Sequence, residues 1–493
     1  MQYTNPALVL TIDIGSSSLR TNLFTAQARQ LVHLEAQLPY EVHTTPDGGV
    51  EIDPGALLEC LFSAIDKTLE LAGERANNIK GVGMCSLVSN VLGVDERGEP
   101  TTPIYTWADT RCAREAEELR ATLSHEEVYE RTGCPIHTSY LPARLLWLQR
   151  DTPGPYGRTT RWISLGDLVH LKLFGRAWQS LSVASWSGLL NRYSLTWDRN
   201  LLSHLGVSEA DLPELVDVDE AVSGLPGEYA KRWHTLRDVP WYPCVGDGAT
   251  GNLGSGCCTP RDLAIQVGTS GAARVLIPGT AAKIPRGLWC YRLDRHTSLL
   301  GGALSEGGNL LDWLAGTLHT GSLEEVQREA AALHPDSHGL TLLPFLAGER
   351  SPGWHGSARA TISGLSLDTR PAHILRAAQE AIAYRFAALY DLLADAQPPP
   401  QRIIASGGAL LNVPGWIGML ADVLGRPVTA SGEDEASSRG AALLTLRSLG
   451  ILSNFDATPA ALGKTYQPNM ERHAIYRQGR QRQQELYEKL IDA

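Results

Sequence analysis

The chain has 493 residues, of which 43% are hydrophobic and 20% charged, and its formal net charge is −11. This length predicts two domains, the composition is typical of a soluble globular protein, and the acidic balance excludes nucleic acid and an anionic membrane as partners. Eight cysteines without a CxxC pair indicate reduced thiols rather than a disulfide scaffold or a zinc site. We expect neither a signal peptide nor a membrane helix, and therefore a cytoplasmic protein.

The N-terminal residues predict a mixed sheet that opens with a loop suited to phosphate. Val9 to Ile12 form an apolar strand, which leads into Asp13 and a turn of glycine and hydroxyl residues, with Arg20 close behind. Residues 19–38 alternate between apolar and polar around a turn at 25–30, which predicts a hairpin and not a Rossmann start. Asp53 and Pro54 then predict the beginning of a helix. The turn residues are Gly15, Ser16, Ser17 and Ser18.

A second candidate segment follows the buried strand expected at residues 81–85. Trp107, Asp109 and Arg111 are spaced two apart, so in an extended segment they share one face. A planar ring can cover the C–H face of a sugar, and the two charged groups can bind hydroxyls or a carboxylate. The alternative is a surface salt bridge beside a core tryptophan.

The acid most suited to catalysis is Asp247, which lies between Gly246 and Gly248. Flanking glycines allow a sharp bend and the close approach of a second molecule, as a general base requires. An ordinary turn aspartate is the alternative. About twenty residues further on, a predicted strand at 263–267 ends in a loop that matches the first one, roughly half a chain apart. This repeat predicts two similar domains that face each other. The second loop consists of Gly268, Thr269, Ser270 and Gly271.

The C-terminal half predicts a long helix from Pro371 to Ala394 and a short strand at 402–406. Gly407 and Gly408 follow that strand, and their lack of side chains lets a flat ring approach the main chain. Asn412 offers an amide to a purine or a ribose.

These motifs together resemble those of the FGGY carbohydrate kinases, within the sugar kinase, heat-shock chaperone and actin superfamily. The segments that carry the resemblance are DIGSSSLR at 13–20, Gly246–Gly248 and VGTSG at 267–271. The family implies an α/β fold of two ribonuclease-H-like domains, with mixed five-stranded sheets flanked by helices and a cleft between them. We expect an N-terminal domain over 1–243, a C-terminal domain over 244–450 and a helical extension over 451–493.

The resemblance implies transfer of the γ-phosphoryl group of ATP to a hydroxyl of a sugar, sugar acid or polyol, with Mg²⁺. Asp247 is the implied catalytic base, and the metal is implied at Asp13 through water and at Asp247. The implied nucleotide-binding residues are Asp13, both loops, Arg20, Gly308, Gly407, Gly408 and Asn412. The implied substrate-binding residues are Ser89, Trp107, Asp109, Arg111, His137 and Asp247.

The segments at 132–149 and 183–191 resemble the gluconate kinase branch, in which His137 would be a polar group for an acidic sugar. One departure keeps the substrate open, because Val88 and Ser89 stand where gluconate and xylulose kinases usually carry Met-His. Glu306 also stands where asparagine is commoner. The alternatives are a ketopentose or polyol kinase, a non-catalytic ATP and sugar sensor, and an actin-like filament or chaperone. The chain would act alone or as a homodimer.

Overall fold

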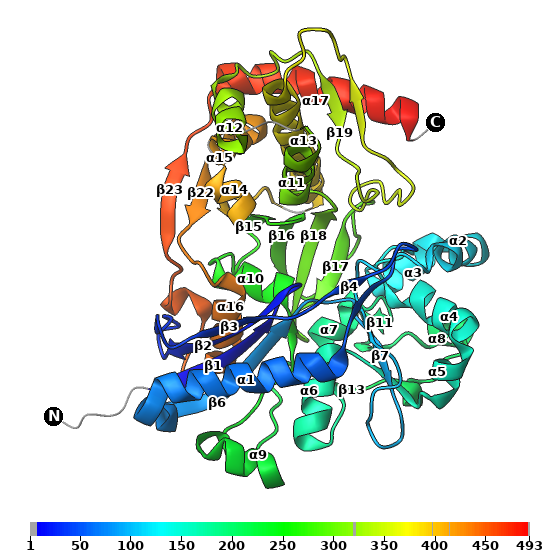
Figure 1. Ribbon diagram of the computed structural model, residues 1–493, viewed down its shortest axis with the longest axis vertical. Coiled ribbons are helices and arrows are strands. Elements are labelled where there is room, and N and C mark those ends of the chain that lie inside the picture. The colour runs from blue at the N-terminus through cyan, green and yellow to red at the C-terminus, as the bar shows by residue number, and fades with distance from the viewer. Residues whose placement is uncertain (1–6, 319–321, 397, 414, 492–493) are drawn as a thin grey trace, which may run out of the picture.

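The computed structural model describes residues 7–318, 322–396, 398–413 and 415–491, which form two lobes, each built on a mixed β-sheet (Figure 1). The first sheet has the order β14-β6-β1-β2-β3. β1 pairs antiparallel with β2 and parallel with β6, and β2 pairs antiparallel with β3, which is the hairpin predicted over residues 19–38. Its strands are β1 (Leu8–Ile14), β2 (Ser18–Thr25), β3 (Ala36–Pro39), β6 (Ile79–Ser86) and β14 (Val245–Gly246).

Helices cover both faces of the first sheet. On β2, the Thr21 hydroxyl donates to the Ala64 carbonyl of helix α1 (Pro54–Ala72), at 3.0 Å. The next side chain, Asn22, donates to the hydroxyl of Ser438 in helix α16 (Ala436–Ser448), also at 3.0 Å. Because successive side chains of a strand point to opposite faces, α1 and α16 lie on opposite sides. The start of α1 is as predicted, since Asp53 accepts a hydrogen bond from the Ala56 amide at 2.7 Å.

Shorter elements complete the first lobe. The strands are β4 (His43–Thr44), β5 (Val50–Ile52), β7 (Leu92–Val94), β8 (Ile104–Tyr105), β9 (Arg161–Ile163), β10 (Trp178–Ser180), β11 (Leu190–Asn191), β12 (Thr196–Trp197) and β13 (Glu214–Val216). The helices are α2 (Ala113–Thr122), α3 (His125–Thr132), α4 (Leu141–Asp151), α5 (Pro153–Arg158), α6 (Leu165–Phe174), α7 (Leu181–Trp186), α8 (Arg199–Leu205) and α9 (Gly227–Arg232).

The second sheet has the order β17-β18-β16-β15-β21-β22-β23. Its strands are β15 (Asp262–Val267), β16 (Gly271–Pro278), β17 (Trp289–Arg292), β18 (Thr297–Leu304), β21 (Arg402–Ser406), β22 (Val428–Ser431) and β23 (Leu462–Tyr466). A separate pair is β19 (Thr341–Leu343) with β20 (Thr361–Ser363). The helices are α10 (Asp247–Gly254), α11 (Gly308–Thr317), α12 (Leu323–Ala332), α13 (Pro371–Ala396), α14 (Gly408–Asn412), α15 (Trp416–Leu424) and α17 (Met470–Leu490).

The two sheets share a five-strand pattern. β18-β16-β15-β21-β22 repeats β3-β2-β1-β6-β14, with antiparallel pairs on one side of the first strand and parallel pairs on the other. Five strands were expected in each sheet, and this number is wrong for the second. β17 and β23 pair antiparallel with β18 and β22 and extend both of its edges. The segment after residue 450, expected to be helical, therefore supplies a strand as well as α17.

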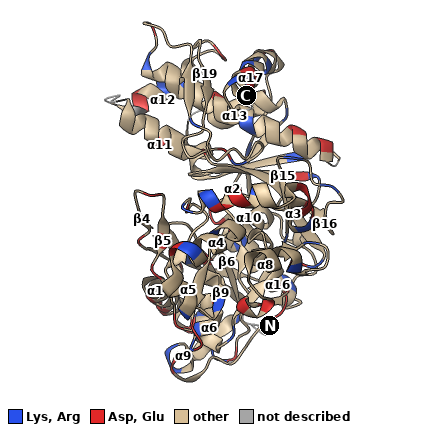
Figure 2. Ribbon diagram, turned by 90° about the vertical axis from the view of Figure 1, so that its right-hand side faces the viewer, with Lys and Arg blue, Asp and Glu red and all other residues tan. Residues whose placement is uncertain are grey.

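Two elements of the expected C-terminal domain, β14 and α16, pack in or against the first sheet. β14 belongs to the first sheet, although it follows residue 243, and α10 begins directly after it. Figure 1 places α10 and α16 between the two sheets. A small apolar core joins β1, β2 and α16 through Val9, Phe24, Ala442, Leu443 and Leu446. Acidic and basic residues are interspersed along the ribbon of both lobes in the view of Figure 2.

Candidate active site

Each of the two glycine and hydroxyl loops is closed by a local hydrogen bond. In the first loop, the Gly15 amide donates to the carbonyl of Ser18, three residues later, at 3.0 Å, and in the second, the Gly268 amide donates to the carbonyl of Ser270, two residues later, at 3.0 Å. Each loop connects the first two strands of its sheet, β1 to β2 and β15 to β16. The repeat seen in the sequence therefore extends to the place of the loops in the two sheets, although their hydrogen bonds differ by one residue. Ser16, Ser17 and Thr269 are exposed between the loop ends.

The second loop lies beside two other predicted nucleotide segments. The Gly308 amide, at the start of α11, donates to the Gly268 carbonyl at 2.7 Å. Gly407 has φ of 96°, and a Cβ there would lie 2.3 Å from the Val267 carbonyl oxygen, so glycine is required. A Cβ on Gly408 would lie 3.5 Å from Asn412 Nδ2. The structure thus gathers these segments around the end of β15.

Asp13 is buried near the end of β1, with 5% of its surface exposed. Its cross-strand partner is Arg20, whose Nε lies 3.5 Å from a carboxylate oxygen of Glu435. The Ser438 hydroxyl, in the first turn of α16, donates to Asp13 at a long 3.5 Å. Burial, together with the charge of Asp247, raises the pKa of Asp13 to about 7, although Arg20 opposes the shift.

Asp247 is the first residue of α10, and Trp186 holds the turn in which it lies. A Cβ on Gly246 would lie 2.9 Å from Trp186 Nε1, and one on Gly248 would lie 3.0 Å from the same ring. The glycines are therefore needed for a close-packed indole as well as for the bend. Burial raises the pKa of Asp247, while Arg274 and the Gly248 amide lower it.

Arg274 was not identified from the sequence, although it is three residues past the second loop. It lies on β16, and its Cζ is 3.3 Å from the position that a Cβ on Gly248 would take. Its Nη1 donates to Gln266 at 3.0 Å. Burial lowers the pKa of Arg274 to about 10, with Asp247 opposing the shift and Arg350 adding to it. The signal available in the sequence was a lone arginine in an otherwise apolar strand.

Two of the predicted substrate residues, Trp107 and His137, are near Arg350, and a third, Ser89, contacts Trp186. The Arg350 guanidinium lies over the Trp107 ring, 5.1 Å from its centroid. His137 is buried and packs edge-on against Trp354, with ring centroids 5.3 Å apart. Burial and then Arg350 lower the pKa of His137 to about 3, so its imidazole is neutral. Ser89 has φ of 55°, and its hydroxyl donates to the Trp186 carbonyl at 2.6 Å.

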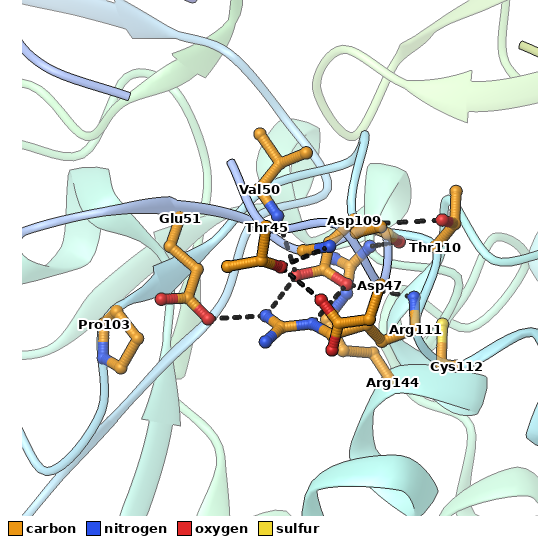
Figure 3. Close-up of polar contacts among 12 residues, drawn as sticks. Thr45, Asp47, Val50, Glu51, Pro103, Asp109, Thr110, Arg111, Cys112 and Arg144 are labelled. Carbon is orange, nitrogen blue, oxygen red and sulfur yellow. Dashed lines mark hydrogen bonds and ion pairs between the residues drawn. The ribbon is translucent and has the colours of Figure 1, made fainter. Parts of the chain in front are cut away.

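Asp109 and Arg111 are paired with each other (Figure 3). Arg111 Nη2 contacts Asp109 Oδ2 at 2.5 Å and Glu51 at 2.6 Å, and its guanidinium lies 4.5 Å from the centroid of the Trp147 ring. Asp109 is 1% exposed and also accepts a hydrogen bond from the Val50 amide at 3.2 Å. These hydrogen bonds of Asp109 and Arg111 are all to residues of the first lobe. This favours a structural role, in which the pair fixes the segment that carries Trp107.

A pocket of about 700 Å³ lies between the lobes. Ile136 of the first lobe and Trp354 of the second are among its lining residues. Trp354 also contacts His137, so this pocket adjoins the region of the predicted substrate residues.

The family models agree with this arrangement. The model for the N-terminal domain of the FGGY family of carbohydrate kinases matches residues 8–254, and the model for the C-terminal domain matches residues 263–449. The chain belongs to the FGGY family of carbohydrate kinases. It is a phosphotransferase with an alcohol group as acceptor, as members of this family are.

Individual FGGY kinases resemble the chain along nearly its whole length. Gluconokinase of Bacillus subtilis (strain 168) is 27% identical, covering 93% of this chain and 91% of that protein. Xylulose kinase of Escherichia coli (strain K12) is 25% identical, covering 98% and 99%. A crystal structure of gluconate kinase from Lactobacillus acidophilus has a TM-score of 0.91 at 24% identity, covering 98% of each chain. Among the described residues, no helix is long and apolar enough to span a membrane.

The segment 348–359 contributes one residue to the core of the second lobe and one to the candidate site. Glu349 is buried in the second lobe, where it accepts hydrogen bonds from Arg385 and, at 2.6 Å, from Tyr487. Arg350 instead points to Trp107 of the first lobe. Neighbouring residues of one motif therefore serve the core and the candidate site.

Proposed function

We propose that this FGGY kinase transfers the γ-phosphoryl group of ATP to a hydroxyl of a sugar acid, with gluconate the first candidate. The observation that carries the proposal is the position of Asp247. It begins a helix between the two lobes, with its charge coupled to Asp13 on one side and to Arg274 on the other. The gluconokinases among the relatives support the choice of sugar acid.

The two loops are the proposed phosphate cradle. Their backbone amides and exposed hydroxyls supply donors for phosphate oxygens, and Arg20 adds positive charge. Gly407, Gly408 and Asn412 would receive the adenosine, because they border the second loop and leave the main chain open.

Asp13 fits a magnesium ion. Its carboxylate is a hard oxygen ligand, and a nearby cation would restore the ionised form that burial and Asp247 disfavour. Bound Mg²⁺ would supply charge neutralisation of the phosphates during transfer. Asp13 would hold this ion through water, and Asp247 is the second carboxylate within range.

Asp247 is the proposed general base. Its carboxylate would accept the proton of the sugar hydroxyl as that oxygen attacks the γ-phosphorus in line. Burial raises the pKa of Asp247, and the charge of Arg274 opposes this shift and so favours the ionised form that accepts a proton.

The test is Asp247→Asn. We expect the sugar-dependent release of ADP to fall by about 10² to 10⁴ in kcat, because the proton acceptor is lost. Calorimetry should show that binding of MgATP is retained. Asp368→Asn, at an exposed position in the second lobe, is the matched control and should leave turnover intact. Near-normal turnover of Asp247→Asn removes this residue from the mechanism.

A ketopentose or polyol kinase is the second candidate, favoured by Val88 and Ser89 at the usual Met-His positions and by the xylulose kinases among the relatives. A panel of gluconate, xylulose, ribulose and glycerol in the same ADP-release assay separates the two candidates. Absence of turnover with every sugar, together with tight ATP and sugar binding, would point to a sensor instead.

A further inference from the structure

Four buried side-chain nitrogen atoms of the candidate site lack a hydrogen-bond partner among the described residues. They are Arg274 Nε, Arg350 Nε, His137 Nε2 and Trp186 Nε1. A buried donor without a partner costs about 1–3 kcal/mol, so such groups seldom cluster without a purpose. All four nitrogen atoms could donate hydrogen bonds to the oxygen atoms of a ligand.

The charge of Arg274 is only partly compensated. It donates to the neutral Gln266, and within the described parts of the chain no ion pair joins it to Asp247. Burial lowers the pKa of Arg274 to about 10, Asp247 opposes this shift only in part, and Arg350 adds to it.

Arg350 is in a similar state. Its guanidinium lies against the Trp107 ring but forms no ion pair with any carboxylate among the residues that the structure describes. Arg274 pairs with Gly301 of β18, and the amide of Ser351, the residue after Arg350, donates to the Ala303 carbonyl of the same strand at 2.9 Å, so the two arginines lie near each other. Two guanidinium groups in one buried region repel each other, and an anion between them removes the repulsion.

Electrostatic interactions link the residues of the site. Beyond burial, which is the largest cause in each case, Asp247 raises the pKa of Asp13, Arg274 opposes the raised pKa of Asp247, and Arg350 lowers the pKa of Arg274 and of His137. Asp247 therefore interacts with Asp13 and with one member of the arginine pair.

We infer that Arg274 and Arg350 together bind the carboxylate of the sugar acid and make this kinase selective for acids over neutral polyols. The inference rests on the proposed function, and it adds the residues that recognise the carboxylate of the substrate. Planar guanidinium groups suit this task because they donate two parallel hydrogen bonds to a carboxylate. The neutral His137 and Trp186 Nε1 would donate hydrogen bonds to the hydroxyl groups of the same sugar acid.

The experiment compares gluconate with glucitol, which carries a hydroxymethyl group in place of the carboxylate. The wild type should have the higher kcat/KM for gluconate. In Arg274→Met and in Arg350→Met, the gluconate-to-glucitol ratio of kcat/KM should fall by about 10- to 100-fold, the usual loss for a charged hydrogen bond. Arg261→Met, at an exposed arginine, is the matched control and should keep the wild-type ratio.

Other outcomes overturn the inference. An equal loss for both substrates would assign the arginines to the transferred phosphoryl group, and an unchanged ratio would assign them to packing. If the wild type phosphorylates only neutral sugars, the sugar-acid proposal fails together with the inference, whereas selectivity that survives in the variants overturns the inference alone.

A second measurement covers variants that fold poorly or a wild type that ignores glucitol. Arg274→Lys retains the charge but not the paired donors, and calorimetry of gluconate binding needs no turnover. We expect weaker gluconate binding with unchanged MgATP binding. Unchanged gluconate affinity in this variant and in Arg350→Lys would contradict the inference.

Discussion

At the scale of single residues, two buried carboxylates with different neighbours divide the work of the site. Asp13 lies beside Asp247 and has its pKa raised to about 7, whereas Asp247 is balanced by Arg274. Because their environments differ, Asp13 is suited to binding a cation, whereas Asp247 is suited to accepting a proton.

This difference predicts how stability depends on pH. Because the pKa of Asp13 is higher in the folded state, the folded protein binds more protons, and its free energy of unfolding falls as the pH rises from about 4 to 7. Asp13→Asn should therefore raise the Tm of the ligand-free protein by about 2 °C or more at about pH 8, and by less at about pH 5. Differential scanning fluorimetry checks both values.

The Asp13→Asn variant should also lose the proton release that accompanies magnesium binding. Addition of Mg²⁺ with ATP should release protons from the wild type near neutral pH, which calorimetry in buffers of different ionisation enthalpy detects. Asp13→Asn should show no such release. For the preceding prediction on stability, a Tm gain of Asp13→Asn that is the same at both pH values would show that Asp13 does not titrate in this range.

At the scale of elements, the site depends on the crossing of α10 and α16. A Cβ on Gly440 of α16 would lie 1.9 Å from the Thr250 carbonyl oxygen of α10, so the helices touch through backbone. Ser438, two residues before Gly440, bonds to Asp13, and Asp247 is the first residue of α10. The crossing therefore fixes the distance between the two carboxylates.

Gly440→Ala should separate these helices. We expect a loss of about 1–3 kcal/mol in the free energy of unfolding, since an added methyl group has no space, and a lower kcat because Asp247 moves with α10. Gly316→Ala is the control, because a Cβ there meets nothing within 4 Å, and it should gain up to about 1 kcal/mol in α11. Denaturant unfolding compares the two, and equal effects would mean that the crossing is not tight.

At the scale of the molecule, the lobes are joined by more than a linker. The Cys290 amide donates to the Gly133 carbonyl at 3.0 Å, and the Tyr140 and Tyr291 hydroxyls are 2.5 Å apart. Trp186 stacks on Tyr291 with ring centroids 3.9 Å apart. On the opposite side of the site, α16 of the C-terminal half covers the first sheet. The lobes therefore stabilise each other.

We predict that calorimetry gives one unfolding transition for the whole chain. A fragment of residues 1–243 should not fold alone, because it lacks β14 and leaves Val9 and Phe24 without α16. Circular dichroism of the fragment checks this expectation, with the full chain as control. Two separate transitions, or a folded fragment, would support the boundary expected after residue 243 as a true domain limit.

The sequence alone determined the features that depend on neighbouring residues. The strand and turn pattern at residues 9–18 and its repeat at 263–271 predicted two related sheets, and the segment at 246–248 predicted a turn with an acid at its centre. Hydrogen bonds such as Gly15 to Ser18 are local, so a short pattern is enough to specify them.

Only the tertiary structure decided which distant groups meet. Arg350 reaches Trp107, Arg274 reaches the turn of Asp247, and Asn22 reaches Ser438, more than four hundred residues later in the chain. It also paired Arg111 with Asp109 and Glu51 and added two edge strands to the second sheet. These contacts arise from packing one lobe against the other, and local spacing carries no record of that packing.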